Sequence, residues 1–283
     1  MQRLLGVIGG SGIYEVPGLT SVRPRPVDTP FGAPSDTVVE GQLGDTTLLF
    51  LPRHGRGHRI PPHQVNYRAN ICALKQLGAE QVVSLSAVGS MRERIAPGHV
   101  VVVDQYIDLT KRRVATFFED GVAAHIGFAD PVCPRLSAAL ADAAQRAGGT
   151  VHRGGTYVCI EGPAFSTRAE SHLYRSWGVS VIGMTAMPEA KLAREAELPY
   201  ATLALATDFD CWHESEEDVS VDAVLAVLHA NAELAKRCVA ELAAALPDPR
   251  ESAASTALAG AVITAPDAIA SETRARLSWL LKP

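Results

Sequence analysis

Two aspartates one residue apart, Asp208 and Asp210, follow an apolar run that extends from Tyr200 to Ala206. The run predicts a buried strand, and residues two apart along an extended chain point to the same face. Two carboxylates that face one spot repel each other when both are ionised, so the pair favours a bound cation, a bound ligand or a shared proton. The spacing therefore indicates metal binding or acid–base chemistry where this strand ends.

A second cluster of polar residues indicates anion binding. It follows the apolar run at residues 46–52 and contains Arg53, His54, Arg56, His58, Arg59, His63 and Arg68. Guanidinium groups match the oxygens of a phosphate and repel cations, so this mixture of arginine and histidine favours an oxyanion. Zinc held by three histidines and a plain solvated loop are the alternatives that the residue types leave open.

Two other strand ends carry donors for an anion. The glycine turn at residues 9–12 includes Ser11, and its backbone amides can approach an anion closely, although the same glycines would also suit an ordinary tight turn. Ser86 lies near the end of the apolar run at residues 81–90. We expect residues 87–89 to form a sharp turn with amides that face the same anion, with close packing of small residues in the core as the alternative.

Two further strand ends combine polar groups with a flat or flexible apolar side chain. Residues 161–163, Glu-Gly-Pro, predict a rigid turn that is followed by Phe165 and by polar residues 166–168, which open a helix. Met184 and Thr185 follow another apolar run. Side chains of this kind most often belong to a core, but at element ends beside polar groups they could hold a planar ligand between them.

Strand-like and helix-like segments alternate along the chain. Apolar runs predict strands at residues 4–9, 46–52, 81–90, 99–109, 179–185 and 200–208. Helical spacing of apolar residues predicts helices at residues 65–78, 134–148, 187–198, 221–246 and 272–281. This alternation predicts an α/β fold with a mainly parallel or mixed sheet, in a single domain over residues 1–283 with a loop at 247–256. Ligands in such folds usually bind outside the carboxyl ends of the strands.

Composition disfavours several classes of function. The net charge is −5 and the basic residues are spread along the chain, which argues against nucleic-acid partners. The five cysteines show no CxxC spacing, so we expect neither a disulfide framework nor a zinc ribbon. No run reaches the roughly 18 apolar residues of a membrane span, and no signal peptide is recognisable, so we expect a cytoplasmic protein without membrane partners. The glycine turn lacks the GxGxxG fingerprint of nicotinamide-dependent dehydrogenases.

Several motifs occur in one order: IGGSG, LPRHGRGH, HQVNYRAN, SAVGSMRE, IEGPAFSTRAES, VIGMTAMPEA and LATDFDCWHE. On these motifs the chain resembles the trimeric purine nucleoside phosphorylase family over residues 4–281. The resemblance implies a single α/β domain with a central mixed, partly barrel-like β-sheet flanked by helices, assembled as a homotrimer with active sites near the interfaces. It also implies phosphorolysis of 5'-methylthioadenosine to adenine and 5-methylthioribose 1-phosphate, with phosphate as co-substrate and with no cofactor or metal.

The resemblance assigns roles residue by residue. The phosphate-binding positions that it implies are Ser11, Arg53, His54, Ser86, Ala87 and Thr185. The substrate-binding positions are Phe165, Ser166, Met184, Asp208, Phe209, Asp210 and Val221, with His125 and Leu280 lining the 5'-methylthio pocket. Leu280 is expected to come from a neighbouring subunit. Ser11 and Ser86 stand where relatives often have threonine, a change that keeps the hydroxyl.

The paired aspartates then acquire a chemical role. Adenine is a poor leaving group unless N7 is protonated, and burial beside a second carboxylate raises the pKa of a carboxylic acid toward neutrality. We expect Asp208 to protonate N7, and Asp210 to raise its pKa and to accept a hydrogen bond from N6. Relatives that act on 6-oxopurines carry asparagine here. A mismatched buried pair costs about 1 to 3 kcal/mol, which favours adenine over hypoxanthine and guanine.

Three alternatives remain. The chain could be a phosphorylase for adenosine, for inosine and guanosine, or for methylthioinosine. It could be a metal-dependent transferase that holds a divalent cation on the DxD pair. It could also be a nucleoside sensor without turnover, although the complete set of expected polar groups in the phosphate loops argues against this.

Overall fold

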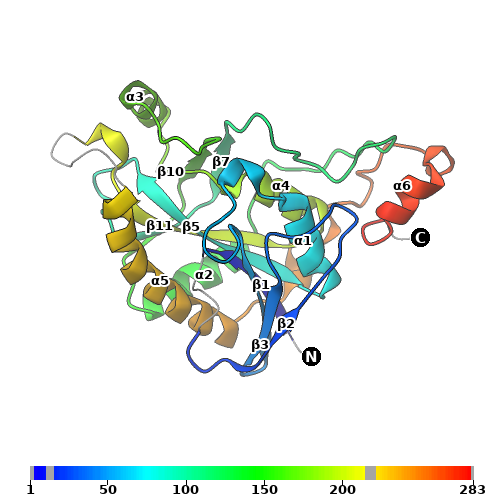
Figure 1. Cartoon of the computed structure of the whole chain (residues 1–283), viewed down its shortest axis with the longest axis horizontal. Helices are drawn as coiled ribbons and strands as arrows, with labels where there is room; N and C mark the ends of the chain where they lie inside the picture. The colour runs from blue at the N-terminus through cyan, green and yellow to red at the C-terminus, as the bar shows by residue number, and fades with distance from the viewer. Residues whose placement is uncertain (1–2, 11–15, 214–220, 282–283) are drawn as a thin grey trace.

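The structure is a computed structural model that describes residues 3–10, 16–213 and 221–281, with side chains from residue 227 onward in the last segment. An 11-stranded sheet forms the centre of this described part (Figure 1). Its strands are β1 (Arg3–Gly9), β2 (Thr20–Arg25), β3 (Val38–Leu43), β4 (Thr46–Pro52), β5 (Gln81–Ser90), β6 (Val100–Val102), β7 (Gln105–Asp108), β8 (Val151–Arg153), β9 (Thr156–Cys159), β10 (Val181–Gly183) and β11 (Tyr200–Asp208).

The long strand β5 organises the sheet because it pairs with three others. Its first residues pair in parallel with β1, and its last two, Gly89 and Ser90, pair antiparallel with β10. β11 runs parallel to β5 along most of its length, with a register shift between Ala206 and Asp208. One path through the sheet is β2-β3-β4-β1-β5-β10-β9-β7, while β11, β6 and β8 form a branch. The sheet is therefore mixed, as predicted.

Helices cover both faces of the sheet (Figure 1). They are α1 (Tyr67–Gln76), α2 (Pro134–Arg146), α3 (Arg168–Ser176), α4 (Ala186–Glu195), α5 (Val221–Ala244) and α6 (Ser271–Arg276). α1 and α4 pack on the face that carries Ile8 and Leu49, and α2 and α5 on the face that carries Val7 and Leu48. Because side chains alternate along a strand, two buried faces require nearly continuous apolar strands, which is why these strands were visible in the sequence.

Short 3-10 helices complete the described chain. They are η1 (Pro62–Gln64), η2 (Asp210–Trp212), η3 (Pro249–Glu251), η4 (Ala253–Thr256) and η5 (Pro266–Ala268). The loop expected at residues 247–256 therefore contains η3 and η4. α6 is shorter than the terminal helix expected at residues 272–281, and no helix in the described part of the chain is long and apolar enough to span a membrane.

Two local predictions were wrong. The sharp turn expected at residues 87–89 is absent, because β5 continues to Ser90 with β11 and β10 as pairing partners. The run at residues 99–109 forms two strands instead of one, because β6 pairs with β11 and β8 whereas β7 pairs with β9. β2 and β3 were not predicted from the sequence. β2 is largely exposed, so it lacks the apolar run that marked the other strands.

Candidate active site

Three hydroxyl groups, those of Ser86, Tyr157 and Thr185, meet beside β5 and form the hydroxyl cluster. The Oγ of Ser86 lies 3.1 Å from the Oγ1 of Thr185 and 3.2 Å from the phenol oxygen of Tyr157. Because β10 runs antiparallel to β5, the chain that leaves β10 returns alongside β5 and brings Thr185 to Ser86. Gly183 is required here, since a Cβ at that position would lie 2.0 Å from the Tyr157 oxygen. Hydroxyl groups held together in this way can donate to one anion.

Arg53 follows β4 and is buried, which disagrees with the alternative of a plain solvated loop at this position. Its Nε donates to Glu189 Oε2 at 2.8 Å, and its Nη2 donates to Glu189 Oε1 at 3.1 Å and to the Ser84 hydroxyl at 2.6 Å. The hydroxyl of Tyr200 donates to the same carboxylate at 2.9 Å. Burial alone would lower the pKa of Arg53, but the Glu189 carboxylate outweighs it and raises this pKa above the usual arginine value. A permanent positive charge is thereby fixed beneath β5.

His54 is held as a neutral ring beside this charge. Its Nδ1 lies 2.8 Å from the carbonyl oxygen of Ile60, which can only accept, so Nδ1 carries the hydrogen and Nε2 is left as an acceptor. The ring stacks on His58 with centroids 4.3 Å apart. Burial, followed by the charge of Arg53, lowers the pKa of His54 to about 4. The ring is therefore neutral at physiological pH.

This shifted pKa makes stability depend on pH in a defined window. An unfolded histidine binds a proton below about pH 6.5, whereas folded His54 resists protonation until about pH 4. Stability is therefore unaffected above about pH 6.5 and falls between those two values, by about 3 kcal/mol in total. Urea unfolding between pH 7 and pH 4 should show a steeper loss for the wild type than for His54→Gln. Parallel curves would contradict this assignment.

Apart from His58, which stacks on His54, three other basic residues of the segment have contacts elsewhere. Arg59 donates to the carbonyl oxygen of Ser35 at 3.0 Å, and Arg68 forms an ion pair with Glu119. His63 lines a separate cavity. Within the described residues there is also no group of three or more His, Cys, Asp or Glu side chains placed to hold a metal ion. Of the predicted anion cluster, Arg53 and His54 are therefore the buried members, and Arg59, His63 and Arg68 lie away from them.

The acid pair, Asp208 and Asp210, lies around Gly89. A Cβ at Gly89 would be 2.9 Å from Asp208 Oδ1 and 3.4 Å from Asp210 Cβ, so only glycine leaves room for both residues. The extended continuation assumed from the sequence is wrong: β11 ends at Asp208, and Asp210 has a φ of +52° at the start of η2. A turn, rather than strand alternation, therefore brings the two residues together.

Asp208 is largely buried, and its two carboxyl oxygens contact hydrogen-bond donors. Thr207 Oγ1 lies 2.6 Å from Asp208 Oδ2 and 3.2 Å from the carbonyl oxygen of Val88. The single hydroxyl hydrogen of Thr207 is shared between these two acceptors, and the backbone N–H of Asp210 donates to Asp208 Oδ1 at 2.8 Å. Burial raises the pKa of Asp208 above its usual value, although the hydrogen bonds from Thr207 and from the N–H of Asp210 act in the opposite direction.

Asp210 is buried against α3. The hydroxyl of Ser171 donates to its Oδ2 at 2.5 Å, which stabilises the carboxylate. Burial and then the neighbouring charge of Asp208 raise the pKa of Asp210 despite this bond. α3 begins as the sequence indicated, with Thr167 as N-cap and a reciprocal bond from Glu170, and this start places Ser171 on the acid pair. Ser171 was not identified from the sequence.

The predicted base-binding residues lie on the turns that surround the acid pair. Met184 packs on the turn at Gly162, where a Cβ would be 2.5 Å from its sulfur. The Oγ of Ser166 is buried and has no hydrogen-bond partner among the described residues, while Phe165 is 49% exposed. Phe209 stacks on His213 with ring centroids 4.6 Å apart. An unpaired buried hydroxyl beside an exposed aromatic ring suits a polar planar ligand.

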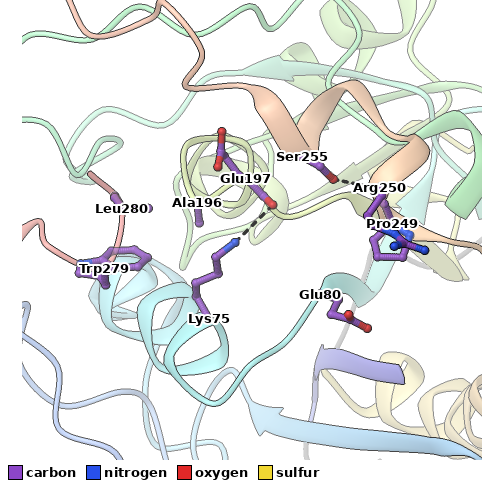
Figure 2. A pocket seen from close by; sticks show the side chains of 9 residues that line it. All are labelled: Lys75, Glu80, Ala196, Glu197, Pro249, Arg250, Ser255, Trp279 and Leu280. Atoms are coloured by element: carbon purple, nitrogen blue, oxygen red, sulfur yellow. Dashed lines mark hydrogen bonds between the residues drawn. The ribbon is translucent and has the colours of Figure 1, made fainter. Parts of the chain in front are cut away.

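The remaining predicted site residues are not brought to this place. The exposed His125 bonds through its backbone to Ala261 in the C-terminal segment. Leu280 is buried in its own chain and lines a cavity of about 230 Å³ with Lys75, Ala196 and Trp279 (Figure 2). That cavity lies at the carboxyl ends of α1 and α4, whereas Thr185 precedes the amino end of α4.

Three of the predicted positions have limited structural information. Ala87 is exposed in β5 next to Ser86. Val221 begins α5, but its side chain lies outside the described residues, as does Ser11. Their assigned roles stay predictions.

Three buried residues that were not identified from the sequence contact residues of the candidate site. Glu189, Tyr157 and Arg113 contact Arg53, the hydroxyl cluster and Met184 respectively. The only available signal was the glutamate in MPEA, a charge in the first turn of a helix with several apolar residues. Arg113 lies in the run KRR, which suggests a solvated loop.

Comparisons with known proteins agree with this architecture. A family model described as the phosphorylase superfamily matches residues 4–244. The chain is 59% identical over 282 residues to S-methyl-5'-thioadenosine phosphorylase of Geobacter sulfurreducens, covering 99% of each protein. It is 51% identical to the enzyme of that name from Koribacter versatilis, covering 99% of this chain and 96% of the relative.

Solved structures also resemble this chain over most of its length. A methylthioadenosine phosphorylase from an antarctic soil metagenomic library superposes with a TM-score of 0.93 at 49% identity, covering 100% of both chains. Methylthioadenosine phosphorylase from Schistosoma mansoni, in complex with adenine in space group P212121, gives a TM-score of 0.84 at 38% identity, covering 92% of this chain and 98% of that chain. With the matching family model and full-length relatives, these similarities establish that the chain belongs to the phosphorylase superfamily.

Proposed function

We propose that this protein catalyses the phosphorolysis of 5'-methylthioadenosine to adenine and 5-methylthioribose 1-phosphate. The observation that carries the proposal is an acid pair beside Gly89 and a hydroxyl cluster around Ser86, two residues of the same strand β5, together with a buried arginine. Gly89, which adjoins the acid pair, is three residues from Ser86, and three residues of extended chain span about 10 Å. In the proposed site, phosphate would bind near Ser86 and the purine near the acid pair. The names of the full-length relatives support this choice of substrate.

On the phosphate side, Ser86 and Thr185 would donate to the anion, and Arg53 would supply a fixed positive charge. The neutral ring of His54 would lie beside the anion. Cleavage of the glycosidic bond makes the ribose cation-like, so a phosphate dianion held against C1' stabilises that state electrostatically. A phosphate oxygen then forms the bond to C1' as the bond from C1' to N9 breaks, and the electron pair of that bond passes to the purine.

On the purine side, Asp208 would donate its proton to N7 while Asp210 accepts from the N6 amino group. Burial favours the protonated form of Asp208, and the Ser171 hydroxyl favours the ionised form of Asp210. Two carboxyl groups with different partners can thus take different roles at one pH. A 6-oxopurine presents an acceptor to the Asp210 carboxylate and would leave a mismatched buried pair.

A substrate panel tests the proposal. Initial rates with 5'-methylthioadenosine, adenosine, methylthioinosine and inosine should show activity on the two 6-aminopurine nucleosides, and none without phosphate. A pocket that selects against O6 should favour the adenine compounds by about 10²-fold or more. Full activity in excess chelator is expected, because the proposed mechanism uses no metal. A preference for inosine compounds, or a requirement for a divalent cation, would refute the assignment.

The finer expectations from the sequence, a homotrimer and a cytoplasmic location, stay part of the proposal. The native mass of the active enzyme and fractionation of its source cells would check them.

A further inference from the structure

Arg113 lies in the segment between β7 and α2, and its side chain is only 2% exposed. Its Nη1 donates to the carbonyl oxygens of Met184 at 2.7 Å and of Met187 at 2.6 Å. Its Nη2 donates to the carbonyl oxygen of Glu161 at 2.7 Å, and its Nε to Glu161 Oε1 at 3.0 Å. One guanidinium therefore ties together two turns that are 23 or more residues apart in the sequence.

Both of these turns carry residues of the candidate site. The turn after β10 presents Met184 and Thr185, and the turn after β9 leads from Glu161 to Phe165 and Ser166. β9 and β10 are parallel neighbours, so backbone pairing fixes their last residues but leaves the following turns without a shared ladder. The planar fork of an arginine, with five donors, can serve carbonyl groups on both turns at once, whereas a lysine offers a single point of charge.

The segment that carries Arg113 is itself fixed by the same partner. The Oε2 of Glu161 accepts the backbone N–H groups of Lys111, at 2.5 Å, and Arg112, at 3.2 Å. The hydroxyl of Tyr67 lies 3.0 Å from Arg113 Nη1 and donates to the carbonyl oxygen of Pro62. Arg113 is thus held through the backbone of the two residues before it and through its own guanidinium, which makes it a rigid spacer between the turns.

We propose that Arg113 is a positioning residue for the nucleoside. By fixing the Glu161 turn against the Met184 turn, it sets the distance between Ser166 on one side of the pocket and Met184 on the other. Arg113 itself makes no contact with the proposed substrate. This inference rests on the proposed function, since it concerns the geometry of the same pocket.

Chemical rescue tests the proposal. Arg113 borders a cavity of about 220 Å³, also lined by Arg68, so a guanidinium ion could enter from there once the side chain is removed. Arg113→Ala should lower kcat/KM for 5'-methylthioadenosine by about 100-fold, the loss expected when reacting groups shift by about 1 Å. Guanidinium chloride at millimolar concentration should restore a large part of it. The matched control is Arg68→Ala, which opens the same cavity and should show no such rescue.

Two further measurements keep the proposal testable. Arg113→Lys should fold with a Tm near that of the wild type and still have a raised KM for the nucleoside. Calorimetric titration measures the affinity of the pocket for adenine without turnover, so it separates this proposal from the proposed function. If the wild type does not turn over 5'-methylthioadenosine, the function fails, and weakened, guanidinium-restored adenine binding in Arg113→Ala would still support the positioning role. Wild-type kinetics and adenine affinity in folded Arg113→Ala or Arg113→Lys would overturn it.

Discussion

Replacing Asp208 with asparagine should lower kcat for 5'-methylthioadenosine by roughly 10²- to 10⁴-fold, the range for loss of a general acid. Asparagine keeps the size of the side chain but has no proton to give to N7. The KM for phosphate should change little, because the hydroxyl cluster and Arg53 are separate from the acid pair. Steady-state kinetics with each substrate varied in turn would measure both effects.

A substrate that needs no protonation distinguishes loss of the acid from a general disturbance. A 4-nitrophenyl glycoside of 5-methylthioribose has a leaving group that departs as an anion, so Asp208→Asn should process it at close to the wild-type rate. Equal losses on both substrates would indicate that the variant has disturbed the pocket. A near wild-type rate on 5'-methylthioadenosine would show that Asp208 is not the acid.

Removing the charge of Arg53 should affect both folding and phosphate use. Arg53→Met leaves the Glu189 carboxylate buried without its cation, and breaking such a pair costs about 3–5 kcal/mol. The double variant Arg53→Met/Glu189→Leu has no unpaired charge, so it should regain much of this stability. The hydroxyl of Tyr200 loses its acceptor in the double variant, which makes the recovery partial. Urea unfolding of the three proteins would measure these differences.

The double variant also separates structure from function. It should remain folded yet require a raised phosphate concentration for half-maximal rate, because the fixed positive charge beneath β5 is gone. The KM for the nucleoside at saturating phosphate should change less. If the double variant has a normal phosphate requirement, Arg53 serves the fold only and its expected role at the anion is wrong.

The fold class was predictable because buried strands and helices have recognisable patterns of apolar residues in the sequence. β4, β5 and β11 are covered on both faces, so each appears as a continuous apolar run, and amphipathic spacing indicated α1, α2 and α4. β2, at the exposed edge of the sheet, has no such pattern. The position of chemistry at strand ends could also be inferred, because strands that end together place their following residues at one edge.

The pairing of the strands decides which strand ends lie together, and the spacing of apolar residues in the sequence does not predict this pairing. The antiparallel run of β10 against β5 brings Thr185 to Ser86, and a parallel alignment would have carried it away. Arg53 finds its carboxylate partner 136 residues further along the chain, and Arg113 reaches its two turns only in the folded state.

The acid pair shows which features could be predicted from the sequence and which depend on the tertiary structure. The residue types and their spacing were enough to indicate a shared proton or a ligand at Asp208 and Asp210. Their actual arrangement follows from a left-handed residue at Asp210 and from the space left by Gly89. Local sequence carries residue chemistry and apolar patterning, whereas the protonation of each carboxyl group depends on its burial and on partners such as Ser171, which only long-range packing brings into place.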